Sequence, residues 1–138
     1  MEKKKIMIVD DAAMMRLVIM NMLSGDPHLQ VGGFASNGRE ALEQLDTVRP
    51  DLILLDIEMP EMDGLEFLRH ARLKSKAKVV VLTSVAPIGS QRATQALTLG
   101  AEAVITKPSG AVSYDLEEKR GTELRRAIYG LLGLEGGF

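Results

Sequence analysis

The stretch Leu52–Gly64 runs LILLDIEMPEMDG and decides how the rest of the chain is interpreted. Four apolar residues lead without a break to a single acid, Asp56. A short continuous apolar run with a turn signal on each side is typical of a strand that is buried on both faces. Pro60 and the pair Asp63-Gly64 then predict a loop before the next helical pattern. Taken alone, an acid at such a strand end more often caps the following turn than carries chemistry.

A strand followed by a helix is predicted five times along the chain. Apolar runs predict strands at 6–9, 29–34, 52–55, 79–82 and 103–106. Helical spacing of apolar residues predicts helices within 13–23, 41–48, 65–71, 93–99 and 124–132, and 109–120 is predicted to be irregular. In the first helix the recurring apolar residues are Met14, Leu17, Val18 and Met22. The alternation predicts an α/β fold with a parallel sheet, in one domain over residues 1–138 with its core at about 4–132.

Composition argues against several classes of function. The net charge of −2 gives no basic excess for nucleic acid, and 4% aromatic residues offer few platforms for stacking bases. The absence of cysteine excludes disulfides and thiolate metal sites and favours an intracellular location. The apolar run at 6–9 is too short for a signal peptide or a membrane span. We therefore expect a cytoplasmic protein that binds neither nucleic acid nor a membrane.

Polar groups follow four of the five predicted strands. They are Asp10-Asp11, Asp56, Thr83-Ser84 and Lys107. The carboxyl ends of parallel strands share one edge of the sheet, so these groups are expected to meet there. Clustered carboxylates repel one another unless a cation lies among them, and Mg²⁺ suits such oxygen ligands. With a lysine and a hydroxyl beside them, the set predicts phosphoryl transfer to a carboxylate.

On these motifs the sequence resembles the response-regulator receiver domains of two-component signalling, over nearly its whole length. The matching segments are the acid pair Asp10-Asp11, the run 54–60 with Asp63-Gly64, the segment 82–84 and Lys107-Pro108. The resemblance implies a flavodoxin-like, doubly wound, five-stranded parallel sheet of order 2-1-3-4-5 with five helices. It also implies a phosphorylation-dependent signalling switch.

The resemblance further implies a role for each motif residue. Asp56 would accept a phosphoryl group from a histidine kinase. Lys107 would pair with that group, and Thr83, with Ser84 beside it, would supply the hydroxyl that reorients onto it. Mg²⁺ would be held by Asp10, Asp11, Asp56 and the backbone carbonyl of Glu58.

A narrower resemblance is to the receiver half of chemotaxis methylesterases. It is carried by residues 58–60, Thr83-Ser84, 106–110 and 112–116. The chain contains no Gly-x-Ser-x-Gly nucleophile motif, so we expect a phosphoacceptor without a separate output enzyme domain in this chain. It is either a free-standing relative or a part of a longer protein.

Two positions depart from the pattern of chemotaxis receivers. Val104 stands three residues before Lys107, where many of them carry an aromatic switch residue. Val85 stands two residues after Thr83 and offers no polar group to guide an attacking water. The family presents the fourth helix, fifth strand and fifth helix to a protein output partner, here near Gln95, Thr98, Val104 and Arg125.

Two other classes fit the sequence less well. A haloacid-dehalogenase-like phosphatase also uses an Asp nucleophile with Mg²⁺. It would need a Gly-Thr turn after its second acid, which the run 56–60 lacks. A flavodoxin-like carrier would need a phosphate loop rich in Ser, Thr and Gly after the first strand, where this chain has two acids. A phosphatase would turn over a phosphate ester steadily, whereas a switch would take up one phosphoryl group.

Overall fold

The computed structural model describes residues 3–57, 62–83, 91–106 and 114–134. Within them, five strands alternate with five helices. The strands are β1 (Lys4–Val9), β2 (Leu29–Ala35), β3 (Leu52–Asp56), β4 (Lys78–Thr83) and β5 (Ala103–Thr106). The helices are α1 (Ala13–Leu23), α2 (Gly38–Val48), α3 (Gly64–Lys74), α4 (Gln91–Thr98) and α5 (Tyr114–Leu132).

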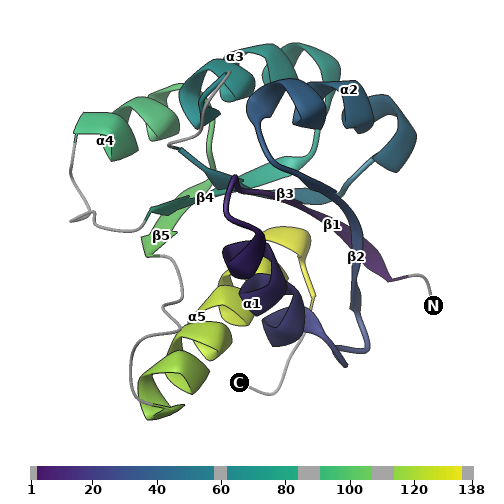
Figure 1. Ribbon diagram of the computed structural model, residues 1–138, viewed down its shortest axis with the longest axis vertical. Coiled ribbons are helices and arrows are strands. Elements are labelled where there is room, and N and C mark those ends of the chain that lie inside the picture. The colour runs from purple at the N-terminus through teal and green to yellow at the C-terminus, as the bar shows by residue number, and fades with distance from the viewer. Residues whose placement is uncertain (1–2, 58–61, 84–90, 107–113, 135–138) are drawn as a thin grey trace.

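The strands form one parallel sheet in the order β2-β1-β3-β4-β5, which confirms the order that the resemblance implies. Helices α2, α3 and α4 cover one face of the sheet, and α1 and α5 cover the other (Figure 1). The chain runs from β1 to its neighbour β2 and then crosses to β3 on the other side of β1. This reversal makes the carboxyl edge between β1 and β3 the switch point where open α/β sheets bind ligands.

The continuous apolar runs are explained by the two helical layers. All five residues of β3 are buried. Ile53 and Leu55 join the core under α2, α3 and α4, whereas Leu52 and Leu54 join the core under α1 and α5. Each such side chain contributes about 1.5–3 kcal/mol by leaving water. A strand that is covered on both faces cannot alternate apolar with polar residues, which confirms the prediction of a central buried strand.

The buried face of α1 differs from the face that the apolar spacing suggested. Its buried residues are Ile19 and Leu23, while Met14 is 71% and Leu17 49% exposed. The reason lies in the composition of the helix, AMMRLVIMNML, in which only Arg16 and Asn21 are polar. A helix that is apolar on nearly every side gives no periodic signal to choose its buried face.

The C-terminal helix is longer than the sequence suggested. It begins at Tyr114, so the prediction of an irregular segment was wrong for residues 114–120, while 109–113 lie outside the described residues. This segment is rich in Glu, Lys and Arg, which favour helix without requiring burial. The apolar pattern from Leu124 onward therefore marked the packed half of the helix and missed its polar half. In the part of the chain that the structure describes, no helix is both long and apolar enough to cross a membrane.

The C-terminal half of α5 is fastened to the connection between α1 and β2. The Tyr129 hydroxyl donates a buried hydrogen bond of 2.6 Å to Oδ1 of Asp26. Burial, reinforced by the Asp26 carboxylate, raises the pKa of Tyr129 to about 12, so the phenol keeps its proton near neutral pH. Arg125 donates from Nη1 to the main-chain oxygen of Met22 at 3.4 Å. These contacts hold α5 beside α1 on one face of the sheet.

Candidate functional site

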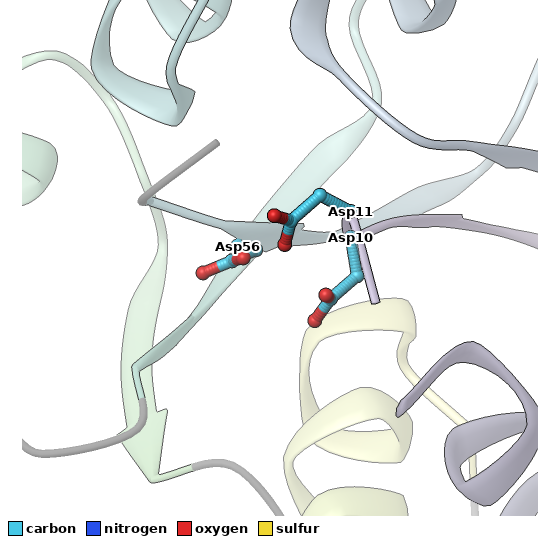
Figure 2. A group of neighbouring side chains, drawn as sticks. All are labelled: Asp10, Asp11 and Asp56. Carbon is cyan, nitrogen blue, oxygen red and sulfur yellow. The ribbon is translucent and has the colours of Figure 1, made fainter. Parts of the chain in front are cut away.

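Three carboxylates meet at the carboxyl edge of the sheet. Asp10 and Asp11 follow β1, and Asp56 ends the neighbouring strand β3. One carboxylate oxygen from each of the three lies within 4.8 Å of the others, and the side chains gather where the two strands end (Figure 2). Asp10 and Asp56 are buried at 1% and 5% exposure, whereas Asp11 is exposed. The cluster therefore has two fixed members inside and one member facing the solvent.

Asp10 is held in place through its main chain and its side chain. Its N–H donates to the carbonyl oxygen of Ala35 at 3.0 Å, which continues the pairing of β1 with β2. Its Oδ1 accepts from the N–H of Ala12 at 2.9 Å and so closes the turn into α1. Arg16 donates from Nη1 to the carbonyl oxygen of Asp10 at 2.7 Å.

Asp56 is held by the return of the chain into α3. Asp63 caps this helix by accepting from the N–H of Glu66 at 3.0 Å. The N–H of Gly64 donates to the carbonyl oxygen of Ile57 at 2.7 Å. A Cβ atom added to Gly64 would lie 2.7 Å from the Cα of Ile57 and would overlap the carbonyl oxygen of Asp56. Glycine at this position therefore lets the helix start directly against the end of β3.

The other predicted site residues divide into one described residue and three that are not described. Thr83 is half-buried at the end of β4, one position beyond the pairing of Leu82 with Asp56. Glu58, Ser84 and Lys107 lie outside the described residues, as does Val85. Val104 pairs with Val81 and packs against the core under α2, α3 and α4. The described part of the site thus brings together all three predicted carboxylates and puts Thr83 on the adjacent strand.

The chemistry of these donors fits a hard divalent cation. Three carboxylate oxygens in one small volume repel one another until a cation compensates them. Carboxylate oxygens are the ligands that Mg²⁺ prefers, and the ion commonly keeps several waters beside the carboxylates that hold it. The arrangement is therefore consistent with the magnesium site that receiver domains carry.

Arg16 was not predicted to lie at the site. Its contact with the Asp10 carbonyl places a guanidinium beside the acid pair. Arg16 also acts on the carboxylate of Glu40 in α2. The pKa of Glu40 is held below its usual value by two hydrogen bonds from Ser36 and, to a smaller extent, by the positive charge of Arg16. The available sequence signal was the single basic residue in a largely apolar helix, six positions after Asp10.

Comparisons with known proteins identify the family. The model of the response regulator receiver domain matches residues 6–114. Among curated proteins, a protein-glutamate methylesterase/protein-glutamine glutaminase of Halalkalibacterium halodurans is 45% identical over 116 residues, which are 84% of this chain and 34% of that protein. The corresponding protein of Treponema pallidum is 47% identical over 80% of this chain and 28% of its own length. The chain thus spans about a third of the length of these curated relatives, over their receiver region.

Solved structures agree with this assignment. The response regulator domain of Thermotoga maritima CheB has a TM-score of 0.85 at 32% identity, covering 98% of this chain and 100% of that one. A chain in the crystal structure of the P1 domain of CheA3 in complex with CheY6 from R. sphaeroides has a TM-score of 0.80 at 50% identity, covering 96% of this chain and 99% of that one. Both the fold and the resemblance to chemotaxis methylesterase receivers are confirmed.

Proposed function

This chain belongs to the response regulator receiver domains, and on that premise we propose that Asp56 is its phosphoacceptor, taking a phosphoryl group from a histidine kinase. One observation carries the proposal: a buried carboxylate at the switch point of the sheet lies within 4.8 Å of two further carboxylates. We also propose that residues 1–138 form a single receiver domain, which the match over 6–114 supports. Its cysteine-free composition favours a cytoplasmic location.

The proposed chemistry is a displacement at phosphorus. An oxygen of Asp56 attacks the phosphorus of phosphohistidine, the P–N bond breaks, and the imidazole nitrogen leaves with the electron pair. Asp10, Asp11, Asp56 and the backbone carbonyl of Glu58 would hold Mg²⁺. When bound, the ion neutralises charge on the phosphoryl oxygens. Asp10, fixed by Ala12 and Ala35, keeps its carboxylate at the site without further reorganisation.

After the phosphoryl group has moved to Asp56, we propose that it is bound by Lys107 and by a hydroxyl of Thr83 or Ser84. Lys107 would pair with the new phosphoryl oxygens as a point charge. Thr83 ends the strand beside β3, so its hydroxyl is within reach of the same edge and would donate to the phosphoryl group. A charge-assisted hydrogen bond of about 1.5–3 kcal/mol can shift a closely balanced loop equilibrium.

Removal of the metal is expected to abolish phosphorylation. With a small-molecule phosphodonor and Mg²⁺, the protein should gain one acid-labile and base-labile phosphoryl group, detected by intact mass. With EDTA in place of Mg²⁺ the gain should fall to background, because the carboxylates then repel the incoming anion. A steady release of phosphate without a stable label would instead support the phosphatase alternative. Equal labelling with and without Mg²⁺ would contradict the proposed metal role.

The exposed end of α1 is proposed as the place where the kinase docks. Met14 and Leu17 are 71% and 49% exposed in the first turns of this helix, which starts directly after the acid pair. Exposed apolar side chains beside a reaction site are suited to a protein partner that delivers a reactive group there. The structure that contains the CheA3 P1 domain in complex with CheY6 supports a kinase domain as the phosphodonor for this chain.

An acidic substitution on α1 is expected to separate docking from chemistry. Leu17→Asp should lower kcat/KM for transfer from a phosphorylated kinase domain by about tenfold or more, the effect of losing an interface anchor. Labelling by the small-molecule phosphodonor should stay within about twofold of the wild type, because the Leu17 side chain has no polar group that takes part in the transfer. Leu73→Asp is the matched control, since Leu73 is 86% exposed at the distant end of α3. Equal transfer to the wild type and Leu17→Asp would place the kinase elsewhere.

The output partner is proposed to bind the α4-β5-α5 face, in a chemotaxis-type pathway. Gln95 and Thr98 are exposed on α4 and are available to such a partner. We do not include Arg125 in this proposed surface, because its guanidinium points toward α1 and donates a hydrogen bond to the carbonyl of Met22. The similarity to the response regulator domain of CheB and to the structure that contains CheY6 supports this pathway.

A further inference from the structure

Arg16 touches the peptide that joins the two acids of the pair. Its Nη1 donates to the carbonyl oxygen of Asp10 at 2.7 Å, a short bond that charge assistance explains. This carbonyl shares one peptide plane with the N–H of Asp11. A donor fixed on the carbonyl therefore fixes the direction in which the chain leaves toward Asp11.

Among the described residues, Asp11 makes no hydrogen bond or ion pair that would restrain its side chain in a comparable way. Asp10 has the Ala35 carbonyl on its N–H and the Ala12 N–H on its side chain, whereas Asp11 is exposed. Helix α1 begins at Ala13, and its N-cap residue Ala12 provides no side-chain cap. The orientation of the exposed acid relative to the two buried ones thus depends on the peptide that Arg16 holds.

We propose that Arg16 is a positioning residue for the metal site: by holding the Asp10–Asp11 peptide, it presents the Asp11 carboxylate to the cation shared with Asp10 and Asp56. This rests on the proposed function, in which these three residues are ligands. Arg16 touches no reacting atom. It acts in the way that outer partners orient metal ligands elsewhere, through a hydrogen bond one step removed from the ion.

The charge of Arg16 and its hydrogen bond predict effects of opposite sign on Mg²⁺ binding. As a cation near the site, Arg16 repels Mg²⁺, so removing its charge alone would tighten binding by about twofold at moderate salt. As a positioning residue it organises the ligands, so removing the donor would weaken binding. The sign of the change in affinity therefore distinguishes the two roles.

The test is a Mg²⁺ titration of the full chain, followed by calorimetry and by backbone amide spectra. Arg16→Met removes both donor and charge and is expected to weaken Mg²⁺ binding by about tenfold, the lower end of the effect of losing an outer partner. Arg16→Lys keeps the charge with a shorter reach and is expected to lie between the wild type and Arg16→Met. In the metal-free protein, the amide signals of Asp11 and Ala12 should move in Arg16→Met.

Arg39→Met is the matched control. Arg39 is an exposed arginine at the start of α2, on the same edge of the sheet, and the structure gives it no hydrogen bond or ion pair among the described residues. It should leave the Mg²⁺ affinity within about twofold and the Asp11 amide unmoved. Chemical unfolding in EDTA tests whether both variants remain folded at the titration temperature.

Equal or tighter Mg²⁺ binding by folded Arg16→Met would overturn the proposal, because the hydrogen bond would then contribute nothing to the affinity. An unmoved Asp11 amide would also overturn it, because the orientation of that peptide would then not depend on Arg16. Failure of the wild type itself to bind Mg²⁺ would instead overturn the proposed function, and this inference with it. Wild-type binding that is unchanged in Arg16→Met would overturn the inference alone.

Discussion

Asp56→Asn is expected to reduce phosphorylation by a small phosphodonor to background while leaving the fold intact. Asparagine has nearly the same shape but no nucleophilic carboxylate oxygen, so the acyl phosphate cannot form. It also removes one of three mutually repelling charges, which lie within 4.8 Å of one another. In EDTA the variant should therefore be more stable than the wild type by on the order of 1 kcal/mol. Mass spectrometry measures the first effect and urea unfolding the second.

Magnesium should reverse the order of stability. A ligand at one hundred times its Kd stabilises the state that binds it by about 2.7 kcal/mol, so saturating Mg²⁺ should make the wild type the more stable of the two. Asp46→Asn is the matched control, because Asp46 is an exposed acid near the far end of α2 whose surface ion pair with Lys74 contributes little. It should label as the wild type does and unfold within about 0.5 kcal/mol of it. A full label on Asp56→Asn would assign the phosphoacceptor to another residue.

The sequence predicted those parts of the fold that depend on local patterns. Continuous apolar runs located the buried strands. A strand that helices cover on both faces has no solvent-exposed side, so its sequence does not alternate apolar with polar residues. The acids of the site were also predictable, since each lies at the end of an apolar strand and parallel strands end at a common edge. The order of the strands required the resemblance to a family, as periodicity says nothing about which strands are neighbours.

The parts that could not be predicted depend on contacts between distant segments. Which face of α1 is buried was not encoded in a helix with only two polar residues. The Arg125 side chain points toward α1, where it contacts the carbonyl of Met22, a residue that is distant in the sequence. The contact of Arg16 with the main chain of Asp10 likewise involves a carbonyl group, which every residue possesses. Contacts with the backbone therefore leave little trace in the pattern of side chains.

Gly64→Ala is expected to be the most damaging single-methyl substitution next to the site. The added Cβ would overlap the carbonyl oxygen of Asp56 and lie 2.7 Å from the Cα of Ile57. Both neighbours are backbone atoms of a buried strand end, so no side chain can rotate out of the way. The start of α3 must then move away from β3, and the hydrogen bond from Gly64 to Ile57 is strained. We expect a loss of about 3 kcal/mol in the free energy of unfolding, measured in urea.

The same substitution should also impair the chemistry, because the displaced atoms belong to the residue that carries the carboxylate. Phosphorylation should be slower than in the wild type even at temperatures where the variant is fully folded. Gly130→Ala is the matched control: Gly130 lies inside α5, and an added Cβ there meets no atom within 4 Å. That control should gain about 0.5–1 kcal/mol, since alanine favours helix and restricts the unfolded chain. A stability of Gly64→Ala equal to the wild type would mean that α3 can shift freely against β3, and that its start does not fix Asp56.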